Sequence, residues 1–401
     1  MKAQTSYATE SDTATAARAC LERLSATDVR PEDLLIVYCT EQHDLNTLCD
    51  TLRSGLGMCK LFGATSAGGV MTEAGLHSAD GVGLGVMLLR AAHGVVGVSL
   101  RDTAHQQAAD AAAAAVHAAI IDADRPGELP ALVWLHATPG QEEAVVAGIE
   151  SVLGEGVPIY GGSAADNTAG GAWKLFDGEQ ISADGVIVAV FYTDTEASAG
   201  YMFHNGYLPS GHAGIVTAVA GRRLISVDGE PAAVWYNRCT DGLISEELTT
   251  GGNILAKTTR APLGRPLTLI SQFQGYNLAH PAMVNANGTI DLFAKLAEGD
   301  VLHVMRGSVD GLIERAGRVA KASVDAHPVD RGHIVAGLGI YCAGCMMALG
   351  ERAHEVPDSY RQGLPPGTPF IGAFTFGEQG SFLKDGNKHG NLMISMVTFA
   401  V

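Results

Sequence analysis

The sequence predicts an α/β protein of two modules, whose largely parallel or mixed sheets are built from repeated strand–helix–strand units. The best-defined unit begins with an apolar run at 334–341 that ends at Cys342. A helix-like segment and prolines follow, and then a second apolar run that breaks at Gly372. Because an apolar run, a helical segment and another apolar run form one strand–helix–strand unit, this stretch predicts a parallel strand pair.

The same pattern occurs twice earlier in the chain, at residues 34–69 and 132–167. Aligned on the glycines of their closing runs, the three units place three residues at comparable strand ends: Cys39, His136 and Cys342. Parallel sheets present their ligands at the carboxyl ends of the strands, so these ends are expected to face pockets. Small residues after a strand also permit tight turns, so the recurrence favours repeated architecture over repeated chemistry.

Length and composition favour two sizeable cores. The 401 residues exceed what one core usually organises, and 47% apolar against 17% charged residues suits buried parallel strands. We expect an amino-terminal helix within 1–27, an α/β module at 28–200 and a second one at 201–401. The polar stretch 193–199 marks the boundary between the modules.

Charge and cysteine usage exclude several functional classes. A formal charge of −17 argues against nucleic acid or an anionic membrane as a partner, since both need a basic surface. Seven scattered cysteines form no disulfide framework and indicate reduced thiols. The amino terminus has no hydrophobic signal region, and no apolar run approaches a membrane span. We therefore expect a soluble, cytoplasmic protein.

The first module is expected to begin with a helix and to alternate strands and helices. Residues 1–10 are polar and are expected to be frayed, and Ser11 or Asp12 can cap an alanine-rich helix through Leu24. The remaining expected elements are strands at 82–89 and 95–100, a helix at 104–121, and strands at 173–176 and 185–192 around an Asp177–Gly178 turn.

The second module follows the same reasoning. Expected elements are strands at 201–204, 214–220 and 224–227, a helix from Pro231, an irregular stretch at 241–266, a strand at 301–305, a helix at 309–322 and a buried final strand at 390–401. Proline suits the first turn of the helix that begins at Pro231, because its missing N–H needs no partner there.

The order and spacing of several motifs resemble the FIST family, over nearly the whole chain. The amino-terminal module carries LFGATSAGGV at 61–70 and VPIYGGSAADN at 157–167, followed by WKLFDGEQISADGVIVAVF. The carboxyl-terminal module carries IVTAVAGRRLISVDGEPAA at 215–233, IYCAGC at 340–345, PFIGAFTFGEQG at 369–380 and the late His389. The family pattern has an arginine after Cys-x-Gly where this chain has Cys345, so a ligand class is not carried over.

The resemblance implies a cytoplasmic sensory module that binds a small ligand and signals through a separate partner protein. Histidine kinases and cyclic-dinucleotide enzymes are the partners it implies. One branch of the family is associated with haem and nitric-oxide sensing, which makes haem a candidate cofactor.

The pair Cys342 and Cys345 has the spacing of a redox or metal motif at the start of a helix. No second CxxC or histidine pair completes a tetrahedral zinc set, so we expect no metal site. The alternative is that both are small, buried and inert sulfurs. If they are reactive, they are candidate ligand contacts.

Polar residues in the closing turns are further ligand-binding candidates. Glu378 follows a strand between glycines, where a buried acid needs a donor or a cation as partner. It can instead be a solvated turn residue. The hydroxyls of Ser66, Ser163 and Thr375 can bind a ligand or satisfy backbone groups.

Fourteen histidines leave room for a haem ligand, although no CxxCH attachment motif exists. The candidates are His136, His204 and His212, with His389 as a further residue of the ligand site.

We therefore expect a sensor without its own output domain, rather than an enzyme. The competing hypothesis is an enzyme that uses Cys342 as nucleophile on a small metabolite, with Glu378 as acid or base. Because Cys342 and Glu378 end two strands of one unit, we expect both to line the same pocket.

Overall fold

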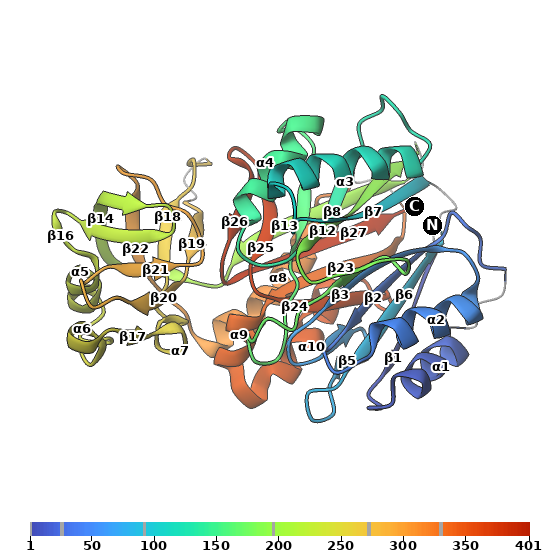
Figure 1. Cartoon of the computed structure of the whole chain (residues 1–401), viewed down its shortest axis with the longest axis horizontal. Helices are drawn as coiled ribbons and strands as arrows, with labels where there is room; N and C mark the ends of the chain where they lie inside the picture. Colours follow the sequence, from blue (N-terminus) through green and yellow to red (C-terminus); the bar gives the residue numbers. More distant parts are fainter. Residues whose placement is uncertain (1, 25–27, 91–93, 195–196, 271–273, 329–331) are drawn as a thin grey trace.

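The computed structural model describes residues 2–24, 28–90, 94–194, 197–270, 274–328 and 332–401. It is a mixed α/β protein, as predicted. Figure 1 shows a large α/β body on the right and a smaller β-rich part on the left, with both ends of the chain on the far side of the body. The body contains the three predicted units.

The first unit is a sheet with the order β1-β6-β2-β3, in which β2 and β3 are parallel and the other pairs antiparallel. Residues 2–8, expected to be frayed, instead form β1, because their backbone pairs with β6 along its whole length. Asp12 caps α1 as predicted, accepting from the Thr15 backbone. The elements are β1 Lys2–Ala8, α1 Thr13–Arg23, β2 Leu34–Cys39, α2 Leu45–Leu56, β3 Lys60–Thr65 and β6 Leu84–Arg90.

The second and third units repeat this arrangement. Their sheets have the orders β7-β12-β8-β9 and β13-β27-β23-β24, again with the last two strands parallel. The second unit contains β7 Gly94–Asp102, α3 Ala108–Asp122, β8 Leu132–Ala137, α4 Glu142–Leu153, β9 Ile159–Ser163 and β12 Gly185–Thr193. The third contains β13 Ser198–Asn205, α8 Val309–Asp325, β23 Ile334–Cys342, α9 Ala343–Leu349, η1 Gly350–His354, α10 Glu355–Gly363, β24 Phe370–Thr375 and β27 Met393–Ala400.

Each unit donates a hairpin to the sheet of another, in a closed cycle. The hairpin β4–β5 of the first unit extends the third sheet, β10–β11 of the second extends the first, and β25–β26 of the third extends the second. The Asp177–Gly178 turn therefore joins β10 to β11, and not to the strand predicted at 185–192. These strands are β4 Val70–Thr72, β5 Gly75–His77, β10 Leu175–Phe176, β11 Ile181–Ser182, β25 Glu378–Phe382 and β26 Gly386–Gly390.

The pairing of the parallel strands shows that Cys39, His136 and Cys342 do not occupy the equivalent positions that were predicted from the sequence. The three aligned glycines pair with Val37, Leu135 and Gly339, so the equivalent residues two positions later are Cys39, Ala137 and Tyr341. His136 precedes and Cys342 follows that position by one residue. Since side chains alternate along a strand, His136 and Cys342 face the opposite side of their sheets from Cys39.

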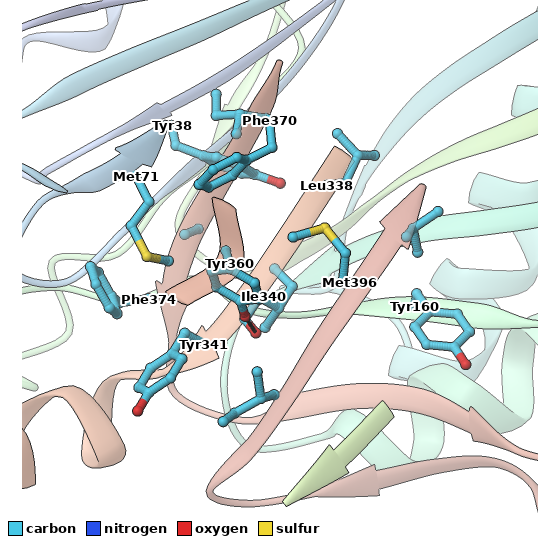
Figure 2. Close-up of a cluster of buried hydrophobic side chains, with 14 of the residues drawn as sticks. Tyr38, Met71, Tyr160, Leu338, Ile340, Tyr341, Tyr360, Phe370, Phe374 and Met396 are labelled. Atoms are coloured by element: carbon cyan, nitrogen blue, oxygen red, sulfur yellow. Dashed lines mark hydrogen bonds between the residues drawn. The ribbon is translucent and has the colours of Figure 1, made fainter. Parts of the chain in front are cut away.

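The three units share one central apolar core, part of which is drawn in Figure 2. Tyr38, Tyr160 and Tyr341 come from different units and are all fully buried there. A protein of this length can therefore bury its largest side chains in the middle of the ring of units, while separate clusters pack under the helices of the first and second units.

The smaller part in Figure 1, which we call the inserted β domain, comprises residues 208–306. The chain leaves the body after β13 and returns at α8. The predicted irregular stretch 241–266 lies here and contains short elements. They are β14 Leu208–Ala220, β15 Arg223–Val227, β16 Glu230–Pro231, α5 Ala232–Cys239, α6 Glu247–Thr250, β17 Gly252–Asn253, α7 Leu255–Thr258, β18 Leu263–Pro266, β19 Tyr276–Ala279, β20 Pro281–Val284, β21 Ile290–Leu292 and β22 Val301–Arg306.

The predicted division into 1–27, 28–200 and 201–401 stays a prediction. Residues 25–27, at its first boundary, and 195–196, within the polar stretch before the second, lie outside the described residues. The second boundary falls inside β13, which pairs with the final strand β27.

Candidate functional site

Four of the predicted site residues come together beneath the inserted β domain. Cys342 and Thr375 end the parallel strands β23 and β24 and lie directly opposite each other, while Glu378 begins β25. Cys345 follows in the first turn of α9. We call Cys342, Cys345, Thr375 and Glu378 the thiol–acid cluster.

Glu378 is fully buried, so the solvated-turn alternative is wrong. The Thr375 hydroxyl donates to its Oε1 at 2.9 Å, and the Met393 backbone N–H donates to Oε2 at 3.0 Å. Burial raises the pKa of this carboxyl group well above its usual value, and the neighbouring Cys342 thiol adds to the effect. Burial therefore favours the protonated, uncharged form of Glu378.

The two thiols, like Glu378, are buried. Cys342 is 5% exposed and Cys345 is not exposed at all. Burial raises the pKa of Cys342 well above its usual value, and contact with the Cys345 thiol adds to this. The hydroxyl of Tyr207 lies 3.6 Å from the Cys345 sulfur. Cys342 and Glu378 thus meet as predicted, but in a closed interior, and their role as ligand contacts stays a prediction.

The two remaining turn hydroxyls differ from each other. Ser66 donates to the Gly69 carbonyl at 2.6 Å and accepts from the Phe374 N–H at 2.9 Å, so it satisfies backbone groups. Ser163 instead donates to Glu142 Oε1 at 2.9 Å. Ser163 therefore points into a second polar group, which contains charged side chains.

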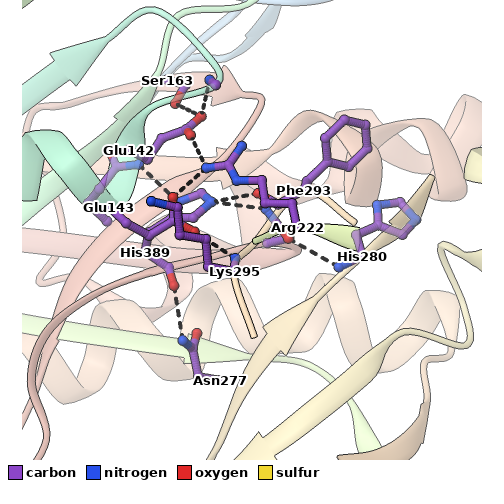
Figure 3. Close-up of polar contacts among 12 residues, drawn as sticks. Glu142, Glu143, Ser163, Arg222, Asn277, His280, Phe293, Lys295 and His389 are labelled. Carbon is purple, nitrogen blue, oxygen red and sulfur yellow. Dashed lines mark hydrogen bonds and ion pairs between the residues drawn. The ribbon is translucent and has the colours of Figure 1, made fainter. Parts of the chain in front are cut away.

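Figure 3 shows this second group, which we call the junction cluster: Glu142, Glu143, Ser163, Arg222 and His389. It joins the body to the inserted β domain. The guanidinium of Arg222, in the turn between β14 and β15, donates to Glu142 Oε2 at 2.6 Å and to Glu143 Oε2 at 2.5 Å. Glu143 Oε1 also accepts from the Lys295 N–H at 2.7 Å.

The charges of the junction cluster depend on one another. Burial acts to raise the pKa of Glu142, but the nearby His389 and Arg222 outweigh it and leave the pKa below its usual value. Arg222 Nε is buried without a hydrogen-bond partner. Two carboxylates surround one guanidinium, so the cluster gathers charged groups that a polar ligand could contact.

His389, on β26, connects the cluster to the inserted β domain. Its Nε2 lies 3.1 Å from the Phe293 carbonyl and its Nδ1 lies 3.3 Å from the Gln379 amide nitrogen. The Asn277 side chain donates to the His389 carbonyl at 2.9 Å. Both ring nitrogens of His389 therefore lie within hydrogen-bond distance of a neighbour.

Sequence reasoning missed Glu142, Glu143 and Arg222. Two acids in the first turn of a helix are an ordinary stabilising pattern, and the Gly221–Arg222 turn is an ordinary hairpin connection. The partners lie 80 residues apart in the chain. Only the three-dimensional fold reveals that the turn reaches this helix.

The role of the histidines as haem ligands stays a prediction, and the structure shows what surrounds them. A haem ligand needs a ring nitrogen that faces a porphyrin-sized cavity. His136 is fully buried, its Nε2 lies 3.0 Å from the Tyr38 hydroxyl, and its ring packs against Phe62 and Trp134. Burial lowers the pKa of His136 to about 3.

The other two candidates have different surroundings. His204 contacts the Asn205 carbonyl at 2.5 Å and Arg315 at 3.5 Å, and His212 is exposed on β14. Over the ranges that the structure describes, no group of three His, Cys, Asp or Glu side chains is arranged to hold a metal ion. Within those ranges, too, no helix is long and apolar enough to cross a membrane.

An open groove of about 790 Å³ lies elsewhere, between α8 and α10. Its wall carries charged side chains that already pair with one another, such as Arg318 with Glu314 and Arg352 with Glu355. None of the predicted site residues lines it.

Comparison with known families now adds to this geometry. The FIST N domain model matches residues 33–230 and the FIST C domain model matches residues 233–381. The chain belongs to the FIST family. FIST domains are small-ligand sensory domains of signalling proteins. In this FIST protein the β14–β15 turn with Arg222 lies at the end of the FIST N match, and the thiol–acid cluster lies in FIST C.

The curated proteins contain no match to this FIST protein. Among solved structures, the crystal structure of cyanuric acid hydrolase from A. caulinodans is similar, with 12% identity and a TM-score of 0.29. The match covers 51% of this chain and 72% of that chain. A likeness this weak supports no argument about function.

Proposed function

We propose that this chain is a cytoplasmic small-ligand sensor whose ligand binds where the inserted β domain meets the body, beside the junction cluster. The supporting observation is the contact of Arg222 with Glu142 and Glu143. This contact joins the two parts of the molecule and lies next to Ser163 and His389. A ligand that competes for any of these groups changes how the two parts meet.

The energetics favour a switch at this position. Removing one partner from a buried ion pair typically costs about 3–5 kcal/mol, because the other charge stays buried without compensation. The Glu142 side chain is 3% exposed and that of Arg222 21%. A ligand that replaces either partner therefore acts on an interaction strong enough to shift the balance between two arrangements.

The proposed output is a separate signalling partner, such as a histidine kinase or a cyclic-dinucleotide enzyme. The three-unit body and the inserted β domain account for nearly all the described residues, so a change in their arrangement is what a partner would read. Family membership supports this proposal, since FIST domains occur in signalling proteins.

Haem does not enter the proposal, because His136 and His204 are held by contacts within the protein and nothing in the structure points to a porphyrin beside them. The enzyme hypothesis gains no support from the site either. A cysteine nucleophile reacts as its thiolate, and burial raises the pKa of Cys342.

The proposal is tested by a thermal-shift screen of polar metabolites, followed by calorimetry with each compound that stabilises the wild-type protein. Ser163→Ala and Glu142→Gln should weaken binding by roughly tenfold or more, since each removes a hydrogen bond to or from a charged group at the site. Glu155→Gln is the matched control, because Glu155 is exposed after α4. Unchanged binding in both site variants would refute the proposed location.

A further inference from the structure

The cysteine pair lies at the end of β23 beneath the inserted β domain. All seven cysteines of the chain are free thiols, and Cys342 and Cys345 are the two that contact each other one turn apart. The thiols are buried, and part of what covers them belongs to the inserted β domain. This arrangement links their accessibility to the position of the inserted β domain.

His280 of the inserted β domain forms part of this cover. A Cβ atom added to Gly344 would lie 3.0 Å from Leu392 Cδ2 of the body, 3.5 Å from the Cys342 sulfur and 3.8 Å from His280 Cε1, so Leu392 and His280 both lie close to the motif. The Asn391 side chain accepts from the His280 backbone N–H at 3.1 Å, and His280 Nε2 lies 3.1 Å from the Leu255 carbonyl. His280 therefore contacts the inserted β domain through Leu255 and the body through Asn391.

Tyr207 couples the thiols to both connections of that domain. It lies in the first connection, between β13 and β14, and its ring packs on Gly307 in the second, where an added Cβ would lie 2.4 Å from the ring. Its hydroxyl donates to the Thr259 carbonyl at 2.7 Å and contacts the Cys345 sulfur. A chemical change at Cys345 would therefore alter the contacts of Tyr207 with the two connections of the inserted β domain.

We propose that Cys342 and Cys345 are a thiol–disulfide pair, oxidised by a small disulfide such as oxidised glutathione only when the inserted β domain lifts from the body. In the closed arrangement, burial keeps both sulfurs from the oxidant. In the open arrangement, Cys342 loses its proton to water and attacks one glutathione sulfur, which releases the first reduced glutathione. The Cys345 thiolate then attacks the Cys342 sulfur and releases the second, so two electrons pass to glutathione.

The test incubates the full-length protein with oxidised glutathione and follows alkylated peptides by mass spectrometry. We expect a disulfide between Cys342 and Cys345 in the wild-type protein. Arg222→Ala removes one of the contacts that hold the inserted β domain against the body, and should speed oxidation by roughly tenfold. Arg223→Ala is the matched control, since Arg223 pairs with Asp291 inside the same domain. It should oxidise at the wild-type rate.

Two further measurements show whether each variant is folded and which thiol resolves the glutathione adduct. Circular dichroism verifies that each variant is folded, and Cys345→Ser should stop at a glutathione adduct on Cys342. Oxidation at equal rates in the two arginine variants, a wild-type adduct that Cys345 does not resolve, or thiols that stay reduced in every protein would each overturn the proposal. Ligand binding plays no part in this test, so its failure is separate from that of the sensor proposal.

Discussion

The carboxyl group of Glu378 lies fully buried at the start of β25, where both oxygens accept hydrogen bonds. Its raised pKa means that folding keeps a proton that the unfolded chain releases. The folded state therefore binds more protons than the unfolded state above pH 4.5, the ordinary value for glutamate. In this range the contribution of Glu378 to stability falls as pH rises.

This predicts a pH dependence that Glu378→Gln removes. Between about pH 5 and the raised pKa, the free energy of unfolding of the wild-type protein should fall relative to that of Glu378→Gln, by up to about 1.4 kcal/mol per pH unit. Urea denaturation at several pH values measures it, with Glu155→Gln as the control that should parallel the wild type. Parallel curves for Glu378→Gln would show that Glu378 ionises normally.

At the scale of elements, the cyclic exchange of hairpins holds the three units together. The edge of each parallel pair is extended by strands from another unit, and three backbone hydrogen bonds cross the centre in the same cyclic sense. They run from Ala67 to Phe374, from Ala165 to Thr65 and from Phe376 to Ser163. The three units can exchange hairpins only if β3, β9 and β24 leave room for the strands that pair with them, which are β10, β25 and β4.

Gly63 provides this room for β10. A Cβ at Gly63 would lie 2.2 Å from the Phe176 ring, which must move away from the first sheet. Gly63→Ala should therefore destabilise the protein by about 1–3 kcal/mol in urea denaturation, as overpacked cores do. Gly156→Ala is the control, since nothing lies within 4 Å of its added Cβ, and it should change stability by less than about 0.5 kcal/mol. Equal stability of the two variants would contradict this account of the exchange.

Some of the strands could be predicted from the sequence and others could not. The parallel pairs were predictable because continuous apolar runs mark strands buried on both faces, as β2, β8 and β23 are. β1 was not, because its outward residues are polar and exposed. The exchanged hairpins have strands of only two to five residues, too short for a periodic signal.

In the candidate site, too, some contacts could be predicted from the sequence and others could not. Cys342, Thr375 and Glu378 were predictable as neighbours, since adjacent parallel strands end at one edge of a sheet. The contact of Arg222 with Glu142 was not, because nothing local marks a turn that reaches a helix in another part of the molecule.

At the scale of the whole molecule, the proposed sensor works through movement of the inserted β domain. Two short connections join it to the body, between β13 and β14 and between β22 and α8, with Gly206 in the first and Gly307 in the second. The buried ion pair of Arg222 with Glu142 and the contacts of His389 hold it in place, together with hydrogen bonds from Thr268 to Asp385 and from His280 to Asn391. A ligand at this junction would therefore be reported as a change in the arrangement of two rigid parts.

Hydrogen–deuterium exchange of the wild-type protein, with and without the compound identified by the thermal-shift screen, tests this most directly. We predict that the compound changes exchange on both sides of the junction, at the start of α4, in the β14–β15 turn and in β26. The connections at Gly206 and Gly307 should change with them. Protection confined to the groove between α8 and α10, with no change at the junction, would contradict the account.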